Sequence, residues 1–476
     1  MQKTADKKEL FERIPVPKAL AAMAVPTIIS QLINLVYNMV DAFFIGRTGN
    51  SYMVAATSLT LTLVMLNTAL SNLFGVGGGS LVARLMGASQ EQECKRVSAF
   101  SIYGAAATAL LYSALAGLFL HPILFFLGAS DETITYASQY TTLVIVIGSV
   151  FSMLSMTLAH LLRNAGYSSR ASTGLSLGGL LNIGLDPLFM FVLLPKGQEV
   201  VGAALATLLS NVVSCGYLLL TLRKVSGKAP LSIRIGDARQ AGKNNIRQLL
   251  SVGIPSAILT GLFDVANVCV NMLAAAHSDM ALAGMGIVMK VERIPTAINL
   301  GICQGAMPII AYNYASGNRE RMKKTVNTAR LWGLIIAGIA IVLFQIFAGS
   351  VTRVFMSTRG GDPEKALLTI GFATLFLRIR CIASPLQFIN YHTSFCMQAM
   401  GNGKATMIHA IVRELVFYIP FQFIMDRIWA ETGLACALPA GEFCGAVFAL
   451  WLFRKIMNGQ KNIEEKITIK KVEKEM

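Results

Sequence analysis

The sequence contains the same hydrophobic pattern twice. Val25-Pro26-Thr27 opens the first long apolar run, and Ile254-Pro255-Ser256 opens the second, 229 residues further along the chain. The segment 77–96 is echoed by 305–324, because a glycine, an apolar turn, a small-residue break and a basic end recur in the same order. Solenoid repeats have periods of roughly 20–50 residues, so this repeat is far too long for a solenoid. The pattern therefore predicts a chain built from two duplicated halves.

The composition predicts that these halves lie in a membrane. The 476 residues are 54% hydrophobic and only 14% charged, whereas soluble domains carry roughly 25% charged residues. Apolar surface in such excess has to face lipid. Duplicated halves made of membrane helices are a common architecture of secondary transporters, in which the substrate site lies between the halves.

The lengths of the apolar runs predict twelve membrane spans. A helical span needs about 20 residues, and the first six candidates form a predicted N-terminal lobe, 18–222, while the last six form a C-terminal lobe, 248–455. The expected fold is an all-α integral membrane protein with twelve transmembrane helices in two pseudo-symmetric six-helix lobes. The candidate spans are 18–46, 53–84, 97–122, 136–159, 171–194, 200–222, 248–276, 282–313, 325–348, 366–398, 405–426 and 433–453.

The positions of the basic residues predict the orientation. Lys and Arg collect in the cytoplasmic loops of membrane proteins, and the central loop 223–247 alone carries seven of them. We therefore expect three cytoplasmic segments: 1–17, the basic linker 223–247 and the tail 456–476. The net charge of +16 then reflects the topology and requires no nucleic acid partner. All external loops together would carry only Arg47, Lys196, Arg353, Arg359, Lys365 and Arg427.

The first span carries a polar stripe that ends in a carboxylate. Gln31, Asn34, Asn38 and Asp41 are offset by 3, 7 and 10 residues, which places them within an arc of about 80° on one helical face. Because a carboxylate inside a span is costly, it is a candidate functional residue. The alternative is that Asp41 only extends toward the membrane interface.

The fifth span carries the second polar signal. Asn182 and Asp186 are four residues apart and share a helical face, and Pro187 follows them. The proline would free a backbone carbonyl that can also bind a cation. Carboxylate, amide and carbonyl oxygens suit Na⁺, and a buried carboxyl group can instead carry a proton. The alternative is a polar pair that only satisfies its own kinked backbone.

Charged residues in the second half give weaker signals. Asp264 lies in the middle of the seventh span, and Lys290, Glu292 and Arg293 lie early in the eighth. These last three could neutralise one another as a structural ion cluster. Arg413, Glu414 and Glu442 are interpreted as structural, and the glycines of 75–79 as a site of close helix packing.

Several function classes are excluded by the motifs that the sequence lacks. It contains no Walker motif, no dinucleotide-binding fingerprint and no nucleophile elbow. We expect no enzymatic activity and no cofactor, with an ion gradient as the energy source in place of ATP. The five histidines are scattered and the eight cysteines form no CxxC motif, so no zinc-type centre is expected.

Four segments resemble the bacterial multidrug and toxic compound extrusion (MATE) family: 34–50, 83–90, 180–191 and 202–211. The resemblance covers residues 18–455. It implies a two-lobe antiporter that exports organic cations, with H⁺ or Na⁺ as the coupling ion. It also implies that Asp41, Asn182, Asp186 and Thr207 form the cation site of the N-terminal lobe and would hold Na⁺ in a sodium-coupled protein, with Tyr140 nearby.

The resemblance and the polar pattern also suggest substrate contacts. Asn34 and Asn38 on the polar stripe, and Asp264 at an acidic position that the family often shows in the seventh span, are predicted to bind substrate. One branch of the family carries a further carboxylate in its tenth span, but 366–398 contains no Asp or Glu. This difference places the predicted coupling in the N-terminal lobe.

The leading hypothesis is a monomeric multidrug efflux antiporter in the bacterial inner (plasma) membrane, with both termini in the cytoplasm. Its expected partners are the lipid bilayer and a small organic cation. The alternative is a flippase for a lipid-linked precursor on a related two-lobe fold, in which Arg378 and Arg380 could meet phosphate groups. An intramembrane enzyme is a third class, but the sequence shows no suitable catalytic arrangement.

Overall fold

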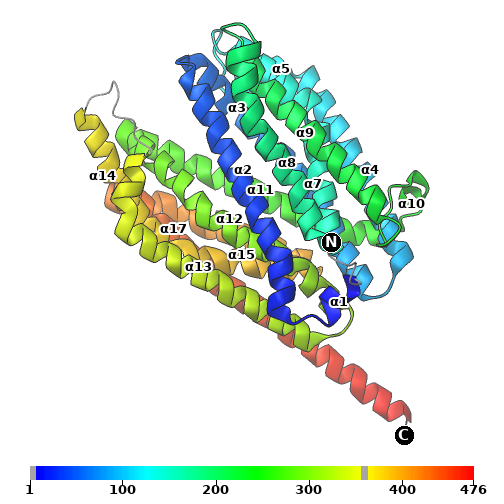
Figure 1. Ribbon diagram of the computed structural model, residues 1–476. Coiled ribbons are helices and arrows are strands. Elements are labelled where there is room, and N and C mark those ends of the chain that lie inside the picture. The colour runs from blue at the N-terminus through cyan, green and yellow to red at the C-terminus, as the bar shows by residue number, and fades with distance from the viewer. Residues whose placement is uncertain (1–6, 355–362, 476) are drawn as a thin grey trace. The chain divides into compact units, whose positions relative to one another are not determined.

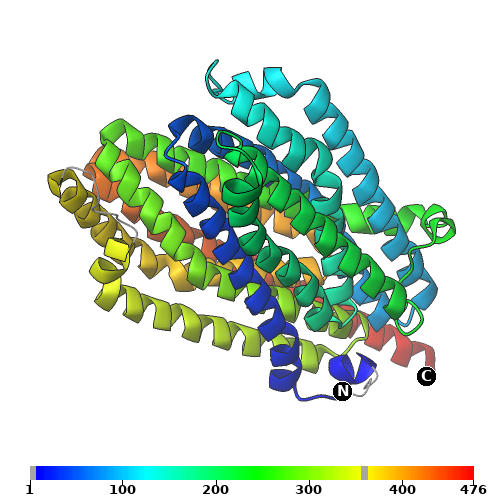
Figure 2. The same cartoon turned by 45° about the horizontal axis from the view of Figure 1, so that its top comes forward.

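The computed structural model describes residues 7–354 and 363–475, and the side-chain surroundings of residues 9–354 and 363–459. Arg359, one of the basic residues of the predicted external loops, lies outside the described residues. All regular secondary structure in the described part of the chain is helical (Figure 1, Figure 2). The prediction of an all-α protein is therefore confirmed.

The helices of the first half include two π-helical segments, η1 and η2. In chain order they are α1 Lys7–Glu12, α2 Val16–Arg47, α3 Ser51–Gly87, α4 Glu91–Leu118, α5 Leu120–Phe126, α6 Ile134–Thr141, η1 Thr142–Ile147, α7 Ser149–Asn164, α8 Ser168–Leu188, η2 Phe189–Leu193, α9 Glu199–Val225 and α10 Ile235–Arg239.

The second half includes a 3₁₀ segment, η3, and a π-helical segment, η4. Its elements are α11 Lys243–His277, α12 Asp279–Ala315, α13 Arg319–Val354, α14 Pro363–Arg380, η3 Cys381–Ala383, α15 Ser384–Ala399, α16 Gly403–Ile411, η4 Val412–Tyr418 and α17 Ile419–Glu475.

The described helices account for the predicted spans. Ten of them are long and apolar enough to cross a membrane, and the pair Ile134–Ile147 and Ser149–Asn164, bent by 45°, makes an eleventh. The last of the ten, Gly403–Gly459, leaves helical geometry at Trp429 and Ala430. Because this break separates the predicted spans 405–426 and 433–453, the helix contains two spans, which brings the total to the predicted twelve.

The helices pack into two compact units. Unit 1 contains the described residues up to Asp264, together with Arg293–Trp332 and Gln398–Lys404; unit 2 contains Val265–Glu292, the described residues of Gly333–Met397, and those from Ala405 onward. The predicted lobes 18–222 and 248–455 follow the sequence duplication, whereas the units follow packing. The boundaries of the lobes come from the repeated sequence and those of the units from contacts between helices, so the two sets of boundaries need not coincide.

Within unit 1, the duplicated motifs make equivalent contacts. Gly77 opens the first echo segment and packs against Gly253, the residue directly before Ile254-Pro255-Ser256. Gly305 opens the second echo segment and packs against Ala24, the residue directly before Val25-Pro26-Thr27. A Cβ at Gly77 would lie 2.6 Å from the Leu249 carbonyl oxygen. The sequence repeat is therefore also a repeat of helix contacts, and small residues allow the close approach.

The other glycines of 75–79 also lie at close helix contacts. A Cβ at Gly75 would meet the His160 ring, one at Gly78 would meet Ser101, and one at Gly79 would meet Asn164. The prediction that this run serves helix packing is confirmed.

The predicted linker 223–247 packs on α4. The Ser232 amide donates to Ser98 Oγ at 2.9 Å, and the Tyr103 hydroxyl donates to the Ile233 carbonyl at 3.0 Å. The short helix α10 lies next to these contacts, and Gln240 beyond it accepts a hydrogen bond from Arg96 at 3.3 Å. The polar loop is therefore held by hydrogen bonds to the first half of the chain.

Candidate functional site

Four helical elements of unit 1 bring the predicted cation-site residues together. α2 lies alongside α8 in both views (Figure 1, Figure 2), α8 packs on α9, and α6 packs on α9. These contacts place Asp41 of α2, Asn182 and Asp186 of α8, and Thr207 of α9 in one region, with Tyr140 of α6 next to them.

Asn182 lies at the centre of the hydrogen bonds in this region. Its Nδ2 donates to Asp186 Oδ1 and to Thr207 Oγ1, each at 3.3 Å. Asn182 is 2% exposed and Asp186 is fully buried. The amide therefore holds a carboxylate of its own helix, one turn away, and a hydroxyl of the next helix at fixed positions.

Three buried oxygens of these residues have no hydrogen-bond donor among the described residues: Asp41 Oδ1, Asp186 Oδ2 and Asn182 Oδ1. Asp41 and Asp186 also act on each other electrostatically. Burial of polar oxygens without a partner is costly, and two like charges close together add to this cost. The arrangement is therefore suited to bind a proton or a small cation.

Two tyrosines border the carboxylates. Tyr140 is buried, lies near Thr207 and is in electrostatic range of Asp41 and Asp186. Tyr37 is in range of the same two carboxylates, and the sequence analysis did not select it. Tyr37 precedes Asp41 by four residues, so the i, i+4 spacing could have indicated it.

The helices lose regular α geometry close to these residues. α8 ends one residue after Pro187, and η2 follows it; η1 begins two residues after Tyr140. Proline removes a backbone donor, and π-helical segments are frequent at functional sites. Pro187 therefore lies where α8 gives way to π-helical geometry.

The remaining predicted site residues form no hydrogen bond with this group among the described residues. Asn38 is exposed, and its Nδ2 donates to the Asn34 carbonyl at 2.6 Å. The Asn34 side chain lies against Gly179 of α8. Asp264 is half-buried on α11, where Arg293 acts on it electrostatically.

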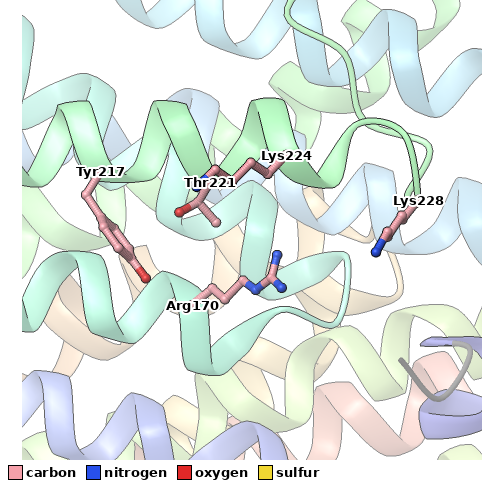
Figure 3. A pocket seen from close by; sticks show the side chains of 5 residues that line it. All are labelled: Arg170, Tyr217, Thr221, Lys224 and Lys228. Atoms are coloured by element: carbon pink, nitrogen blue, oxygen red, sulfur yellow. The ribbon is translucent and has the colours of Figure 1, made fainter. Parts of the chain in front are cut away.

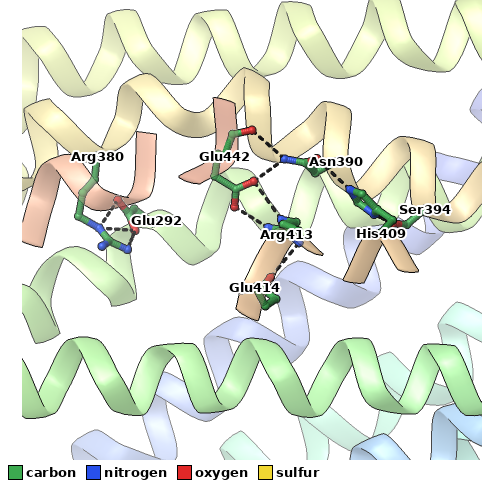
Figure 4. Close-up of polar contacts among 8 residues, drawn as sticks. All are labelled: Glu292, Arg380, Asn390, Ser394, His409, Arg413, Glu414 and Glu442. Carbon is green, nitrogen blue, oxygen red and sulfur yellow. Dashed lines mark hydrogen bonds and ion pairs between the residues drawn. The ribbon is translucent and has the colours of Figure 1, made fainter. Parts of the chain in front are cut away.

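Unit 2 contains a second buried polar group, shown in Figure 4. Arg413 lies between two carboxylates: its Nε donates to Glu442 at 3.0 Å, and its NH1 lies 3.3 Å from Glu414. Asn390 connects Glu442 to His409, with hydrogen bonds of 2.6 Å and 3.1 Å. The structural role expected for Arg413 and Glu442 is supported by these contacts.

Glu292 pairs with a residue far from its own sequence neighbours. Its carboxylate accepts hydrogen bonds from Arg380 at 3.0 Å, across 88 residues of sequence (Figure 4). The expected cluster of Lys290, Glu292 and Arg293 is therefore incomplete without Arg380. The same pairing also neutralises one of the two cations considered for the flippase alternative.

No group of three or more His, Cys, Asp or Glu side chains that could hold a metal ion occurs in the described part of the chain. The donor set on α2, α8 and α9 is made of carboxylate, amide and hydroxyl oxygens. Such hard oxygen donors suit alkali and alkaline-earth cations better than transition metals.

The chain matches one family of known proteins in two places. The sequence model of the family described as MatE matches residues 26–188 and 255–424. The two matches begin at Pro26 and Pro255, the two prolines that open the duplicated runs. The internal duplication predicted from the sequence is therefore also seen by comparison with the family.

Curated relatives match over nearly the whole chain. "Multidrug export protein MepA" of Staphylococcus haemolyticus is 29% identical over 448 residues, which cover 94% of this chain and 95% of the relative. The protein of the same name from Staphylococcus aureus (strain MRSA252) is 30% identical over 440 residues, which cover 92% and 94%.

Solved structures share the fold. A structure described as the outward-facing conformation of a multidrug resistance MATE family transporter of the MOP superfamily has a TM-score of 0.89 at 23% identity, with coverage of 97% of this chain and 100% of that one. A MATE structure in complex with MaL6 has a TM-score of 0.90 at the same identity and coverage. The prediction of a two-lobe, all-α membrane fold is confirmed by these matches.

Proposed function

Because the chain belongs to the MATE family, we propose that it is a secondary active multidrug efflux transporter. It exports lipophilic organic cations in antiport with H⁺ or Na⁺, by alternating access of a central site. The names of its relatives, which are multidrug export proteins, support the direction of transport. The observation that carries the proposal is the set of unpaired buried oxygens on Asp41, Asn182 and Asp186.

The coupling ion binds where these oxygens converge. Asp41, Asn182, Asp186 and Thr207 supply carboxylate, amide and hydroxyl oxygens, and Na⁺ or a proton would neutralise the repulsion between the two carboxylates. Tyr140 borders the site beside Thr207. No further cofactor is needed, because the membrane potential supplies about 2.3 kcal/mol per charge at 100 mV, enough for roughly 50-fold accumulation.

Negative charge in this region also favours a cationic substrate. In a low-dielectric interior, a carboxylate attracts a cation more strongly than in water. Asn34 and Asn38, one to two turns before Asp41 on the same helix, and Asp264 of α11 are proposed to contact the substrate. A second candidate, a flippase for a lipid-linked precursor, would use Arg378 and Arg380 to bind phosphate groups. The pairing of Arg380 with Glu292 disfavours it.

We further propose that the protein acts as a monomer in the bacterial plasma membrane, with residues 1–17, 223–247 and 456–476 in the cytoplasm. The support for this orientation is the concentration of basic residues in these segments, because positive charge is retained on the cytoplasmic side.

The test is transport by the purified protein in proteoliposomes. A fluorescent organic cation is followed while a Na⁺ gradient or a pH gradient is imposed separately. We expect one of the two gradients to drive uptake into vesicles, and the Asp41→Asn variant to lose this drive while keeping its fold. Gradient-driven transport by Asp41→Asn at the wild-type rate would contradict the coupling role of this region.

A double-mutant cycle tests whether the two carboxylates share one ion. Asp186→Asn should lose coupling as Asp41→Asn does, and the double variant should lose little more, because removal of either carboxylate already destroys the site. Asn182→Ala should be partly impaired, and Thr207→Ser should retain activity, since serine keeps the hydroxyl that Asn182 contacts. Small losses that add in the double variant would contradict a shared site.

Binding without transport distinguishes the two ions. If Na⁺ binds the folded protein, the unfolding temperature should be higher in NaCl than in KCl at the same concentration, because a ligand of the native state stabilises that state. The Asp41→Asn variant should show no difference between the two salts. Equal unfolding temperatures of the wild type in both salts would assign coupling to the proton.

A further inference from the structure

A basic pocket lies at one end of the membrane helices of unit 1, away from the carboxylates. It has a volume of about 420 Å³ and is lined by Arg170 of α8, Tyr217, Thr221 and Lys224 of α9, and Lys228 of the following turn (Figure 3). The volume falls within the roughly 300–1,000 Å³ of small-molecule sites. Its lining contains three cationic side chains and no acidic one.

The three cations are available to an anion. Arg170, Lys224 and Lys228 form no ion pair within the described part of the chain. The Arg170 guanidinium lies 5.5 Å from the centroid of the Tyr167 ring. The ring attracts the guanidinium as a cation without supplying an acceptor oxygen, so this contact does not compete with a phosphate for the N–H donors of Arg170.

The helix that carries Arg170 increases the positive potential. Arg170 lies in the first turn of α8, which has no acidic residue in that turn and no side-chain cap. The amino end of a helix is positive, so a cation there is unfavourable and an anion is favoured. Figure 3 shows the Arg170 side chain extending from α8 on the side where Lys228 lies. An anion in this pocket would therefore meet Arg170, Lys224 and Lys228 together.

An apolar groove runs along the same helix. It has a volume of about 400 Å³ and lies between α2 and α8, with Ile29 and Ile33 on one side and Leu177 and Leu180 on the other. Four hydroxyl side chains of α8 also line it, among them Ser169, directly before Arg170, and Thr173, three residues after Arg170. α8 therefore borders a cationic pocket at its amino end and an apolar groove along its length, which matches the two parts of a phospholipid.

From this combination we propose that unit 1 binds an anionic phospholipid, with its phosphate in the basic pocket and an acyl chain in the groove between α2 and α8. The phosphate of the bound lipid partly offsets the positive charge at the end of α8, and basic pockets between membrane helices are a known way to hold such lipids. This site is separate from the proposed cation site and does not depend on the transported substrate.

The test compares lipids on the purified protein by native mass spectrometry, with phosphatidylglycerol and phosphatidylcholine of identical acyl chains. We expect phosphatidylglycerol to be retained on the order of 100-fold better, since each basic residue near a membrane surface contributes roughly fivefold. The triple variant Arg170→Gln, Lys224→Gln, Lys228→Gln should lose this preference. Equal retention of both lipids by the wild type would overturn the proposal.

A matched control separates the pocket from general surface charge. Arg223, Arg239 and Lys243 are exposed basic residues of the same region that do not line the pocket. Replacing these three with glutamine removes the same charge and should leave the preference for phosphatidylglycerol unchanged. An equal loss in this control would show that the preference comes from surface charge and would contradict a specific pocket.

A soluble competitor distinguishes a lipid from a free phosphate compound. Glycerol 1-phosphate carries the head-group chemistry without acyl chains, so it should displace phosphatidylglycerol only weakly if the groove contributes. Displacement at concentrations similar to those of the lipid would identify the pocket as a site for soluble phosphates and overturn the lipid assignment. Unchanged unfolding temperatures of both triple variants serve as the check that they fold.

Discussion

Replacing Glu442 by glutamine should destabilise the protein far more than the same replacement of Glu414. Both are buried carboxylates beside Arg413, but only Glu442 accepts hydrogen bonds: from Arg413 Nε at 3.0 Å, from Arg413 NH2, and from Asn390 Nδ2 at 2.6 Å. Neither oxygen of Glu414 has a hydrogen-bond donor among the described residues. Arg413 therefore depends on Glu442 for its hydrogen-bonded counter-charge.

The expected magnitudes follow from these contacts. Removing one partner of a buried, hydrogen-bonded ion pair costs about 3–5 kcal/mol, because the remaining charge stays buried without compensation. Glu442→Gln should therefore destabilise the protein by about that amount. Glu414→Gln removes the surplus negative charge while Arg413 keeps Glu442, so its effect should lie within about 1 kcal/mol of zero or be stabilising.

Thermal unfolding in detergent, followed with a thiol-reactive fluorescent dye, measures the difference. The described cysteines are free, and Cys381 and Cys396 in unit 2 are buried, so the dye reports on its unfolding. At roughly 2 °C per kcal/mol for a large domain, Glu442→Gln should lower the unfolding temperature by at least about 6 °C. Equal shifts for the two variants, or no shift for Glu442→Gln, would refute the assignment of Arg413 to Glu442.

Three further predictions concern packing, substrate charge and topology. Gly253→Ala should destabilise the protein in the same thermal assay, because the new Cβ would lie 2.0 Å from a backbone oxygen. A Cβ at Gly261, on the same helix, meets open space. Gly261→Ala should therefore stabilise the protein by up to about 1 kcal/mol. Asp264→Asn should weaken export of cationic dyes more than of neutral ones in the proteoliposome assay, and equal losses would indicate a structural role. In a variant without native cysteines, an impermeant maleimide added outside the cell should label Ser130→Cys and leave Arg239→Cys unlabelled; the reverse pattern would invert the proposed orientation.

The membrane architecture could be predicted from the sequence because it depends on local properties. Span length, the alternation of apolar and polar faces, and the excess of basic residues in certain loops are all set by neighbouring residues. The same holds for part of the candidate site: Asn182 and Asp186 share a helical face through their spacing alone, and they form the expected contact. Thr207, in contrast, was selected only through resemblance to a family, since its contact with Asn182 joins two different helices.

The sequence by itself determined which segments become membrane helices, that the chain is duplicated, and that Asn182 and Asp186 share one face of their helix. Tertiary structure decided which charges pair, because partners such as Arg380 and Glu292 are 88 residues apart, and no periodicity relates them. It also decided that the basic residues of α8 and α9 share a pocket, and that Asp41 and Asp186 retain unpaired oxygens. Periodicity specifies the face of one helix, whereas the partner of that face depends on how distant helices pack.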